Sequence, residues 1–126
     1  MQIIISNSSD LAIYEQIEEQ IKSLILSGEL TSGEMLPSIR NLAKDLKISV
    51  ITTKRAYDEL EANGFIKTIP GKGSFIKTKS DEFVKEEVLK NIELYLQTSI
   101  QIAKQYNIKN EEVKQIFDLL MEDENE

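Results

Sequence analysis

One stretch, residues 35–75, restricts the fold of this chain more than any other. Its first part holds two runs with apolar residues at helical spacing, residues 39–46 and 50–63, separated by only three residues. Ser38 and Ser49 stand immediately before these runs, where a serine hydroxyl caps the free amides of a helix. Two short helices joined so tightly are typical of a helix-turn-helix. The side chains expected to be buried are Ile39, Leu42, Ala43, Leu46, Thr53, Ala56, Tyr57 and Leu60.

The second part of the stretch predicts a β-hairpin. Residues 65–69 and 74–78 alternate between apolar and polar side chains, as two paired strands do. Gly71 and Gly73 lie between them and permit a tight reversal of the chain. A helix-turn-helix followed by a hairpin is the winged form of this motif. In it, the N-terminal end of the second helix presents its side chains to the major groove of DNA.

An amphipathic helix is expected before this stretch. From Leu11 onward, apolar residues recur at helical spacing until Gly28, a residue suited to the left-handed end of a helix. Residues 2–6 favour a short extended arm, and residues 31–34 are expected to form a loop. The apolar face of the helix is expected to hold Tyr14, Ile17, Ile21, Leu24 and Ile25, and the opposite face Glu15, Glu18, Glu19 and Lys22.

After the hairpin, the sequence predicts a tail of two helices, the second capped by Asn110. Each helix carries an apolar stripe, and two helices alone cannot cover both stripes. The DNA-binding domain or a second copy of the chain could cover them, or the stripes could line a ligand site. A second copy is the simplest of these covers. The predicted fold is therefore mostly α with a small β-hairpin: a winged helix-turn-helix domain over residues 1–79 and a two-helix dimerisation tail over residues 80–126. The expected interface residues are Val88, Ile92, Tyr95, Ile102, Ile116, Phe117 and Leu120.

The distribution of charge indicates the kind of partner. The whole chain has a net charge of −7, which by itself argues against nucleic acid. However, residues 35–79 contain nine basic residues against four acidic ones, or +5, whereas residues 80–126 contain five against twelve, or −7. Because the local field rather than the net charge attracts a polyanion, the basic winged-helix stretch favours DNA as its partner.

The composition excludes most catalytic and metal chemistry. The chain has no histidine and no cysteine, so neither a Ser-His nor a Cys-His nucleophile pair can form, and a zinc site with its usual ligands is excluded. No calcium-loop spacing or glycine-rich phosphate loop is visible. We therefore expect no enzyme activity, no metal and no cofactor, and the sequence specifies no small-molecule effector.

Targeting signals are also missing from the sequence. No apolar run approaches the length of a membrane span. Residues 1–5 are too short, and lack the basic start, to be a signal peptide. A chain without cysteine fits a reducing compartment, so we expect a cytoplasmic protein with no membrane partner.

Several linked motifs resemble the GntR family of bacterial transcription regulators. They begin with Ile13-Tyr14-Glu15-Gln16-Ile17 and continue, in the family's order, with Leu-Pro-Ser-x-Arg from Leu36, Lys-Arg-Ala-Tyr from Lys54, and Gly-Phe-Ile…Gly-Lys-Gly-x-Phe from Gly64. The short tail resembles the YtrA subfamily. This resemblance implies a tail that dimerises and a role in controlling a transporter operon.

The residues expected to contact DNA combine the family motif with helix-turn-helix geometry. They are Ser38, Arg40, Ser49, Val50, Thr52, Lys54, Arg55, Gly71 and Lys72. The resemblance implies that Arg40 contacts DNA, and its guanidinium can reach a phosphate or a guanine. The alternative is a surface ion pair with Asp45. Many relatives carry Arg or Pro at the position of Val50 and a polar residue at that of Ile51. Val50 and Ile51 cannot form bidentate contacts to guanine, but they can pack against a thymine methyl.

Four of these roles have a simpler alternative. Ser38 also serves as a helix cap, and Gly71 also meets the geometry of an ordinary hairpin turn. Lys54 is an exposed lysine that could simply be solvated, and Arg55 can pair within the domain as well as with a phosphate.

The function these expectations define is a homodimeric repressor that binds an inverted-repeat operator. The alternative is a protein-interaction module with a degenerate winged helix.

Overall fold

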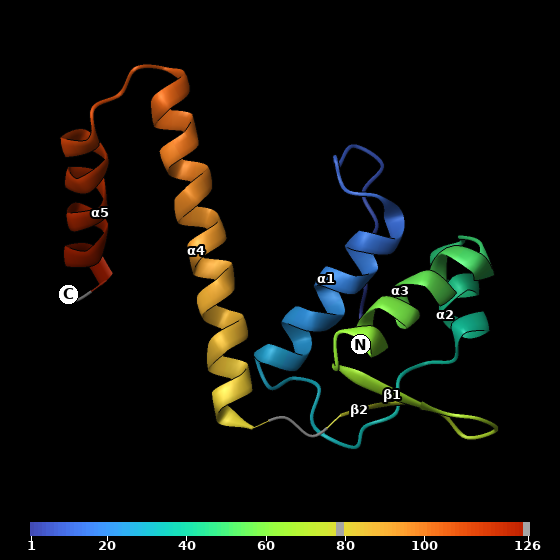
Figure 1. The fold of residues 1–126 in the computed structure, drawn as a ribbon. Coiled ribbons are helices and arrows are strands. Elements are labelled where there is room, and N and C mark those ends of the chain that lie inside the picture. The colour runs from blue at the N-terminus through green and yellow to red at the C-terminus, as the bar shows by residue number, and fades with distance from the viewer. Residues whose placement is uncertain (78–79, 125–126) are drawn as a thin grey trace. The chain divides into compact units, whose positions relative to one another are not determined.

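The computed structural model describes residues 1–77 and 80–124 and divides into two compact units, Met1–Asp81 and Glu82–Glu126 (Figure 1). Unit 1 holds three helices and a two-stranded antiparallel sheet, and unit 2 holds the remaining two helices. The predicted fold class, mostly helical with one hairpin, is confirmed. Residue 79, the expected end of the DNA-binding domain, lies outside the described residues. The elements are α1 (Ile13–Leu26), α2 (Ile39–Leu46), α3 (Val50–Ala62), β1 (Ile66–Ile69), β2 (Gly73–Ile76), α4 (Asp81–Gln105) and α5 (Asn110–Glu124).

The core of unit 1 forms around α3, which packs against α1, α2 and β1. The four inward positions predicted for α3 are all buried, and among them Thr53 is fully buried with its hydroxyl donating to the Ser49 carbonyl at 3.1 Å. In α2, Leu42 and Ala43 are buried, as expected from the helical spacing. Helices α1 and α3 and the start of the hairpin thus share one core, whose largest fully buried apolar side chains are Phe65, Ile17, Ile21, Leu60 and Ile66.

Two glutamines of α1 hold the N-terminal arm. The Gln20 amide bonds both backbone groups of Ile4, at 2.9 Å to its N–H and 2.7 Å to its carbonyl. One turn earlier, the Gln16 amide does the same to Ser6, at 2.8 and 3.0 Å. The side chains thus replace a neighbouring strand, and they fix the predicted arm in an extended course without any strand pairing.

One residue of α1 contradicts the predicted polar face. Glu18 is 9% exposed rather than solvated. Its carboxylate lies 3.0 Å from the Lys22 ammonium and accepts a 3.4 Å hydrogen bond from the Asn63 side chain. The helix period alone cannot reveal this, because Asn63 lies 45 residues further along the chain and reaches Glu18 only through packing of α3 on α1.

A short extended segment, residues 34–36, pairs with the free side of the hairpin. β1 and β2 pair antiparallel with Ile66 opposite Ile76 and Ile69 opposite Gly73. On the other side of β2, the Leu36 amide donates to the Ser74 carbonyl and the Ile76 amide donates to the Glu34 carbonyl, both at 2.8 Å. The sequence predicts a plain loop over residues 31–34, and the end of that loop is instead paired. The predicted strand end at residue 78 lies outside the described residues.

One buried hydroxyl links α3 to the start of α2. Tyr57 is 2% exposed and its hydroxyl donates to the Pro37 carbonyl at 2.7 Å. Burial raises the pKa of this hydroxyl well above its ordinary value of 10.0, because the phenolate form is disfavoured away from water. The bond holds the entry of α2 against α3, and so helps to set the geometry of the helix-turn-helix.

Tyr57→Phe is expected to lower the free energy of unfolding by about 1–2 kcal/mol at pH 7, because the Pro37 carbonyl loses its partner. The raised pKa means that this tyrosine stabilises the fold fully below about pH 10, and less as the pH rises and the unfolded chain ionises first. The difference between the two proteins should therefore shrink in urea titrations above about pH 10. Tyr14→Phe is the matched control, since no hydrogen bond of the Tyr14 hydroxyl is found in the described residues. A difference that stays constant with pH would contradict the assignment.

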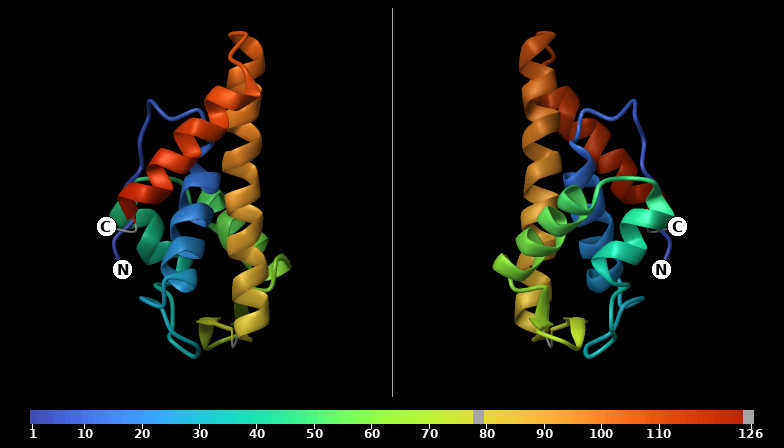
Figure 2. Two further views of the ribbon diagram at one scale, coloured as in Figure 1. Left: turned by 90° about the vertical axis from the view of Figure 1, so that its left-hand side faces the viewer. Right: turned by 90° about the vertical axis from the view of Figure 1, so that its right-hand side faces the viewer.

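Unit 2 consists of α4 and α5 joined by a turn at Asn107, which has a left-handed φ of 59°. The predicted break at this residue is confirmed. The predicted cap at Asn110 is wrong: the Lys109 carbonyl accepts the first helical bonds, from Glu112 at 3.0 Å and Val113 at 3.3 Å, so Asn110 is already the first residue of α5. Away from the turn the two helices diverge (Figure 2).

Candidate nucleic-acid interface

The two predicted helix caps are present. The Ser38 hydroxyl accepts a hydrogen bond from the backbone N–H of Asn41, and the Ser49 hydroxyl accepts one from the backbone N–H of Thr52, both at 3.1 Å. Each serine satisfies one of the free N–H groups at its helix start and leaves others of the first turn open. The starts of α2 and α3 are thereby fixed in position, with the remaining amides available for an anion.

The turn between the helices is set by Lys47, whose φ of 58° is left-handed. This conformation allows the Ile48 amide to donate back to the Ala43 carbonyl at 3.0 Å, which ends α2 in the manner of a left-handed cap. Because only three residues separate the end of α2 from the start of α3, the conformation of Lys47 helps to set the angle between the two helices.

The outward face at the start of α3 is apolar. Val50 is 48% exposed and Ile51 is 81% exposed, the highest value among the large apolar side chains that the structure describes. The Thr52 hydroxyl lies 2.7 Å from the Ser49 hydroxyl, so these two predicted base contacts are bonded to each other in the free protein. The side chains left open for a groove are Val50 and Ile51, and Ile51 is the more exposed of the two.

The three predicted cations of α2 and α3 differ in their surroundings. Arg40 is exposed and has no ion pair within residues 1–77 and 80–124, so the alternative pairing with Asp45 is not formed. The Lys54 ammonium lies 2.7 Å from the Asp58 carboxylate, one turn on, and both side chains are exposed. Such an exposed pair contributes little stability and is readily broken. The Arg55 guanidinium stacks over the Tyr14 ring, 3.8 Å from its centroid.

The tip of the hairpin presents Gly71 and Lys72. Gly71 has a φ of +77° and open space around it, so its backbone conformation, rather than close contact, accounts for the glycine. Gly73 has a φ of +126°, and a side chain there would also meet the Met35 sulfur at 3.2 Å. Lys72 is exposed, and its amide donates to the Ile69 carbonyl at 3.0 Å. The turn thus holds one lysine at the tip of the paired hairpin.

The structure brings these parts to one side of unit 1. The α2–α3 turn, the first turn of α3 and the hairpin tip lie on the same side in Figure 1. A helix end and a hairpin tip arranged in this way can reach a groove and the adjacent backbone of one DNA duplex. Sequence reasoning missed one member of this surface, Tyr14, because its partner Arg55 belongs to a different helix and no local pattern links the two.

Other kinds of site are not supported by the part of the chain that the structure describes. Within residues 1–77 and 80–124, no group of three or more acidic side chains is arranged to hold a metal ion. None of the helices in the same residues combines the length and apolar character needed to cross a bilayer.

The fold and this surface define a winged helix-turn-helix protein. The family model described as bacterial regulatory proteins, gntR family, matches residues 13–76, which include α1, both helices of the motif and the hairpin. The chain therefore belongs to the GntR family. Members of this family are regulators of transcription rather than enzymes, in agreement with the expectation from composition.

The chain is similar to YtrA proteins in particular. It is 43% identical over 74 residues to the HTH-type transcriptional repressor YtrA of Bacillus subtilis, a match that covers 59% of this chain and 57% of that repressor. It is 34% identical to the solved structure of YtrA from Sulfolobus acidocaldarius, a GntR-family transcription factor, with a TM-score of 0.58 over 71% of this chain and 95% of that one. The predicted YtrA-like character is confirmed.

A third comparison includes the tail. The crystal structure of a transcriptional antiterminator from Listeria monocytogenes EGD-e is 32% identical, with a TM-score of 0.74, and the match covers 98% of this chain and 92% of that one. The combination of a winged helix with two further helices is therefore shared along almost the whole length.

Proposed function

We propose that this protein is a sequence-specific DNA-binding repressor that binds an inverted-repeat operator as a homodimer. The observation that carries the proposal is the outward face of α3. It combines a capped helix start with two exposed apolar side chains, Val50 and Ile51. Exposed isoleucine costs free energy in water, and a thymine methyl in the major groove would cover it.

The charged residues around this face supply the contacts to the DNA backbone. Lys54, Arg55 and Lys72 are exposed on α3 and on the hairpin tip, where they can reach phosphates on either side of the groove. The Lys54–Asp58 pair would exchange its carboxylate for a phosphate. Ser38 and Ser49 would place the starts of α2 and α3 against the phosphates, since helix starts favour anions.

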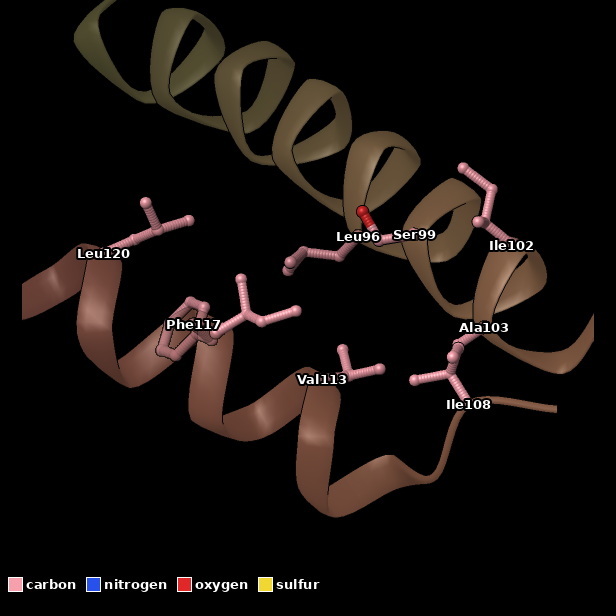
Figure 3. Close-up of a pocket in the computed structure, with 9 residues that line it drawn as sticks. Leu96, Ser99, Ile102, Ala103, Ile108, Val113, Phe117 and Leu120 are labelled. Atoms are coloured by element: carbon pink, nitrogen blue, oxygen red, sulfur yellow. The ribbon is translucent and has the colours of Figure 1, made fainter. Parts of the chain in front are cut away.

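The homodimer is supported by the surface of unit 2. All seven predicted interface side chains are exposed in the single chain, from Val88 at 38% to Tyr95 at 73%. Four of them line an apolar groove of about 340 Å³ between α4 and α5 (Figure 3). The groove is lined by Leu96, Ser99, Ile102, Ala103, Ile108, Val113, Ile116, Phe117 and Leu120.

Exposed apolar surface on this scale favours association. Ala103 is the one buried apolar residue of unit 2 within the described range, so the two helices have almost no core of their own. A second copy would bury both apolar faces in one four-helix arrangement. Two-fold symmetry would then present two α3 helices, and the operator would be an inverted repeat with half-sites about one helical turn, or a multiple of it, apart.

We propose a transporter operon as the target, as the resemblance to the YtrA subfamily implies, and the cytoplasm as the location, which the lack of cysteine fits. Selection of bound DNA from a random pool tests the main proposal. Recovery of an inverted-repeat motif, which then shifts in gels against unrelated competitor DNA, is the expected result. Binding that shows no sequence preference at all would instead favour the protein-interaction module with a degenerate winged helix.

Lys72→Ala is expected to weaken binding to all sequences about equally. It should also make the dependence of log affinity on log salt shallower, by roughly one unit for each phosphate that the lysine neutralises. Lys72 stands at the hairpin tip, away from α3, so its removal should not disturb that helix. Titrations at several salt concentrations, with the selected operator and a scrambled one, measure both effects.

Lys109→Ala is the matched control for this variant. It removes the same charge from unit 2 and should leave the salt dependence of operator binding unchanged. A slope equal to that of the wild type after Lys72→Ala would exclude a phosphate contact by Lys72.

A further inference from the structure

We propose that Tyr14 is a positioning residue for DNA binding. Its ring holds the Arg55 guanidinium in one orientation, ready to contact a DNA phosphate beside the major groove. This inference rests on the proposed function and adds to it a residue of α1, outside the helix-turn-helix and the hairpin.

The Arg55 guanidinium lies close over the face of the Tyr14 ring. The central carbon of the Arg55 guanidinium lies 3.8 Å from the centroid of the Tyr14 ring, within the range in which an aromatic face attracts a cation. A stacked guanidinium is bound through its flat face, which leaves the N–H groups at its edge free to donate. No hydrogen bond or ion pair of Arg55 is found within the described ranges, so these donors are open to an external acceptor.

The position of Arg55 on α3 places these donors at the proposed groove. Arg55 follows Ile51 by one helical turn and lies on the same face, opposite the buried side of α3. α1 packs against α3, and Tyr14 is half-buried near the start of α1. The ring therefore stands on a rigid element beside the recognition surface, and it holds the arginine along the edge of that surface that faces α1.

Lys54, the neighbouring cation, differs from Arg55 in how its charge is paired. Lys54 is bonded to Asp58 at 2.7 Å, so it must leave a carboxylate before it can meet a phosphate. Arg55 has no such competitor within the described residues, and its guanidinium already lies against the Tyr14 ring. Ordering a long side chain on binding costs about 0.5–1.5 kcal/mol, which corresponds to a decrease of about 2- to 10-fold in affinity per half-site if the stack is removed.

The test is a double-mutant cycle on the full-length protein with the operator selected from a random pool. Tyr14→Leu removes the ring and should weaken binding to all operator variants by about 2- to 10-fold per half-site. Arg55→Ala should weaken it at least as much. In the Arg55→Ala background Tyr14→Leu should have no further effect, because the ring acts only through the arginine. The conservative variant Tyr14→Phe keeps the aromatic face and should restore most of the binding.

Three outcomes would overturn the inference: Tyr14→Leu binds as the wild type does, its effect persists undiminished in the Arg55→Ala background, or Tyr14→Phe weakens binding as much as Tyr14→Leu. The last result would assign the effect to the hydroxyl. Melting temperatures show whether each variant is folded. If Tyr14→Leu is not folded, Arg55→Lys decides: it keeps the charge and the packing of α1 but removes the planar stack, and wild-type affinity would overturn the inference. Absence of sequence-specific binding by the wild type would contradict the proposed function instead.

Discussion

Phe117→Asp is expected to convert the proposed dimer into monomers at concentrations where the unmodified chain is dimeric. Phe117 lies on α5 and points into the apolar groove between α4 and α5 (Figure 3). A carboxylate there would be buried on association without a partner, because the groove is lined by aliphatic side chains and one serine. Among buried ions, an unpaired charge is the most costly arrangement.

The expected effect is large because symmetry doubles it. Each copy contributes one substituted residue to a two-fold interface, and an uncompensated buried charge costs about 3 kcal/mol or more. Two such charges would weaken association by roughly four orders of magnitude. The affinity for the operator should also decrease, because a monomer presents only one α3 to the DNA.

Leu119→Asp is the matched control. Leu119 is close to Phe117 on the same helix and similarly exposed, 55% against 49% for Phe117, but it lies on the opposite side of α5 and does not line the groove. Sedimentation velocity at several protein concentrations should show a dimer for Leu119→Asp and a monomer for Phe117→Asp. Dissociation by both variants would mean that the interface is not confined to the groove but includes the opposite side of α5, and dissociation by neither would exclude the groove as the interface.

Arg40→Ala is expected to cost about 1–3 kcal/mol per half-site and to abolish discrimination at one symmetric base pair of the operator, if Arg40 forks onto a guanine. In the structure, the Arg40 side chain is available for contact with DNA. Arg40 lies in the first turn of α2 and is exposed, and it has no ionic partner within the described residues. Its guanidinium therefore gives up no ion pair on binding, so truncation removes only interactions made with DNA.

Competition binding with single-base operator variants measures this effect. Lys72→Ala is the comparison, since it is expected to weaken every variant about equally. If Arg40→Ala also lowers all affinities by the same factor, with the base profile unchanged, Arg40 contacts the backbone. The contacts that recognise the bases would then be made by the start of α3 and the hairpin tip.

The local structure of this protein could be predicted from its sequence alone. The serines before α2 and α3, the glycines of the hairpin and the helical spacing of the apolar residues predicted the helix starts, the turn and the buried face of α3. These features depend on residues within one or two helical turns of each other, because helix capping and the helical period both act over that distance. The exposed faces of α4 and α5 were predicted by the same reasoning, because their apolar stripes exceed what two helices can bury.

The pairing of polar groups, by contrast, emerged only from the packing of the helices. Gln16 and Gln20 bind the backbone of the N-terminal arm, and Glu18 is buried against Asn63. The stack of Arg55 on Tyr14 belongs to the same group. A long polar side chain is compatible with either face of its own helix, so its partner is fixed by how the helices pack. That packing brings together residues far apart in sequence, and no local pattern records it.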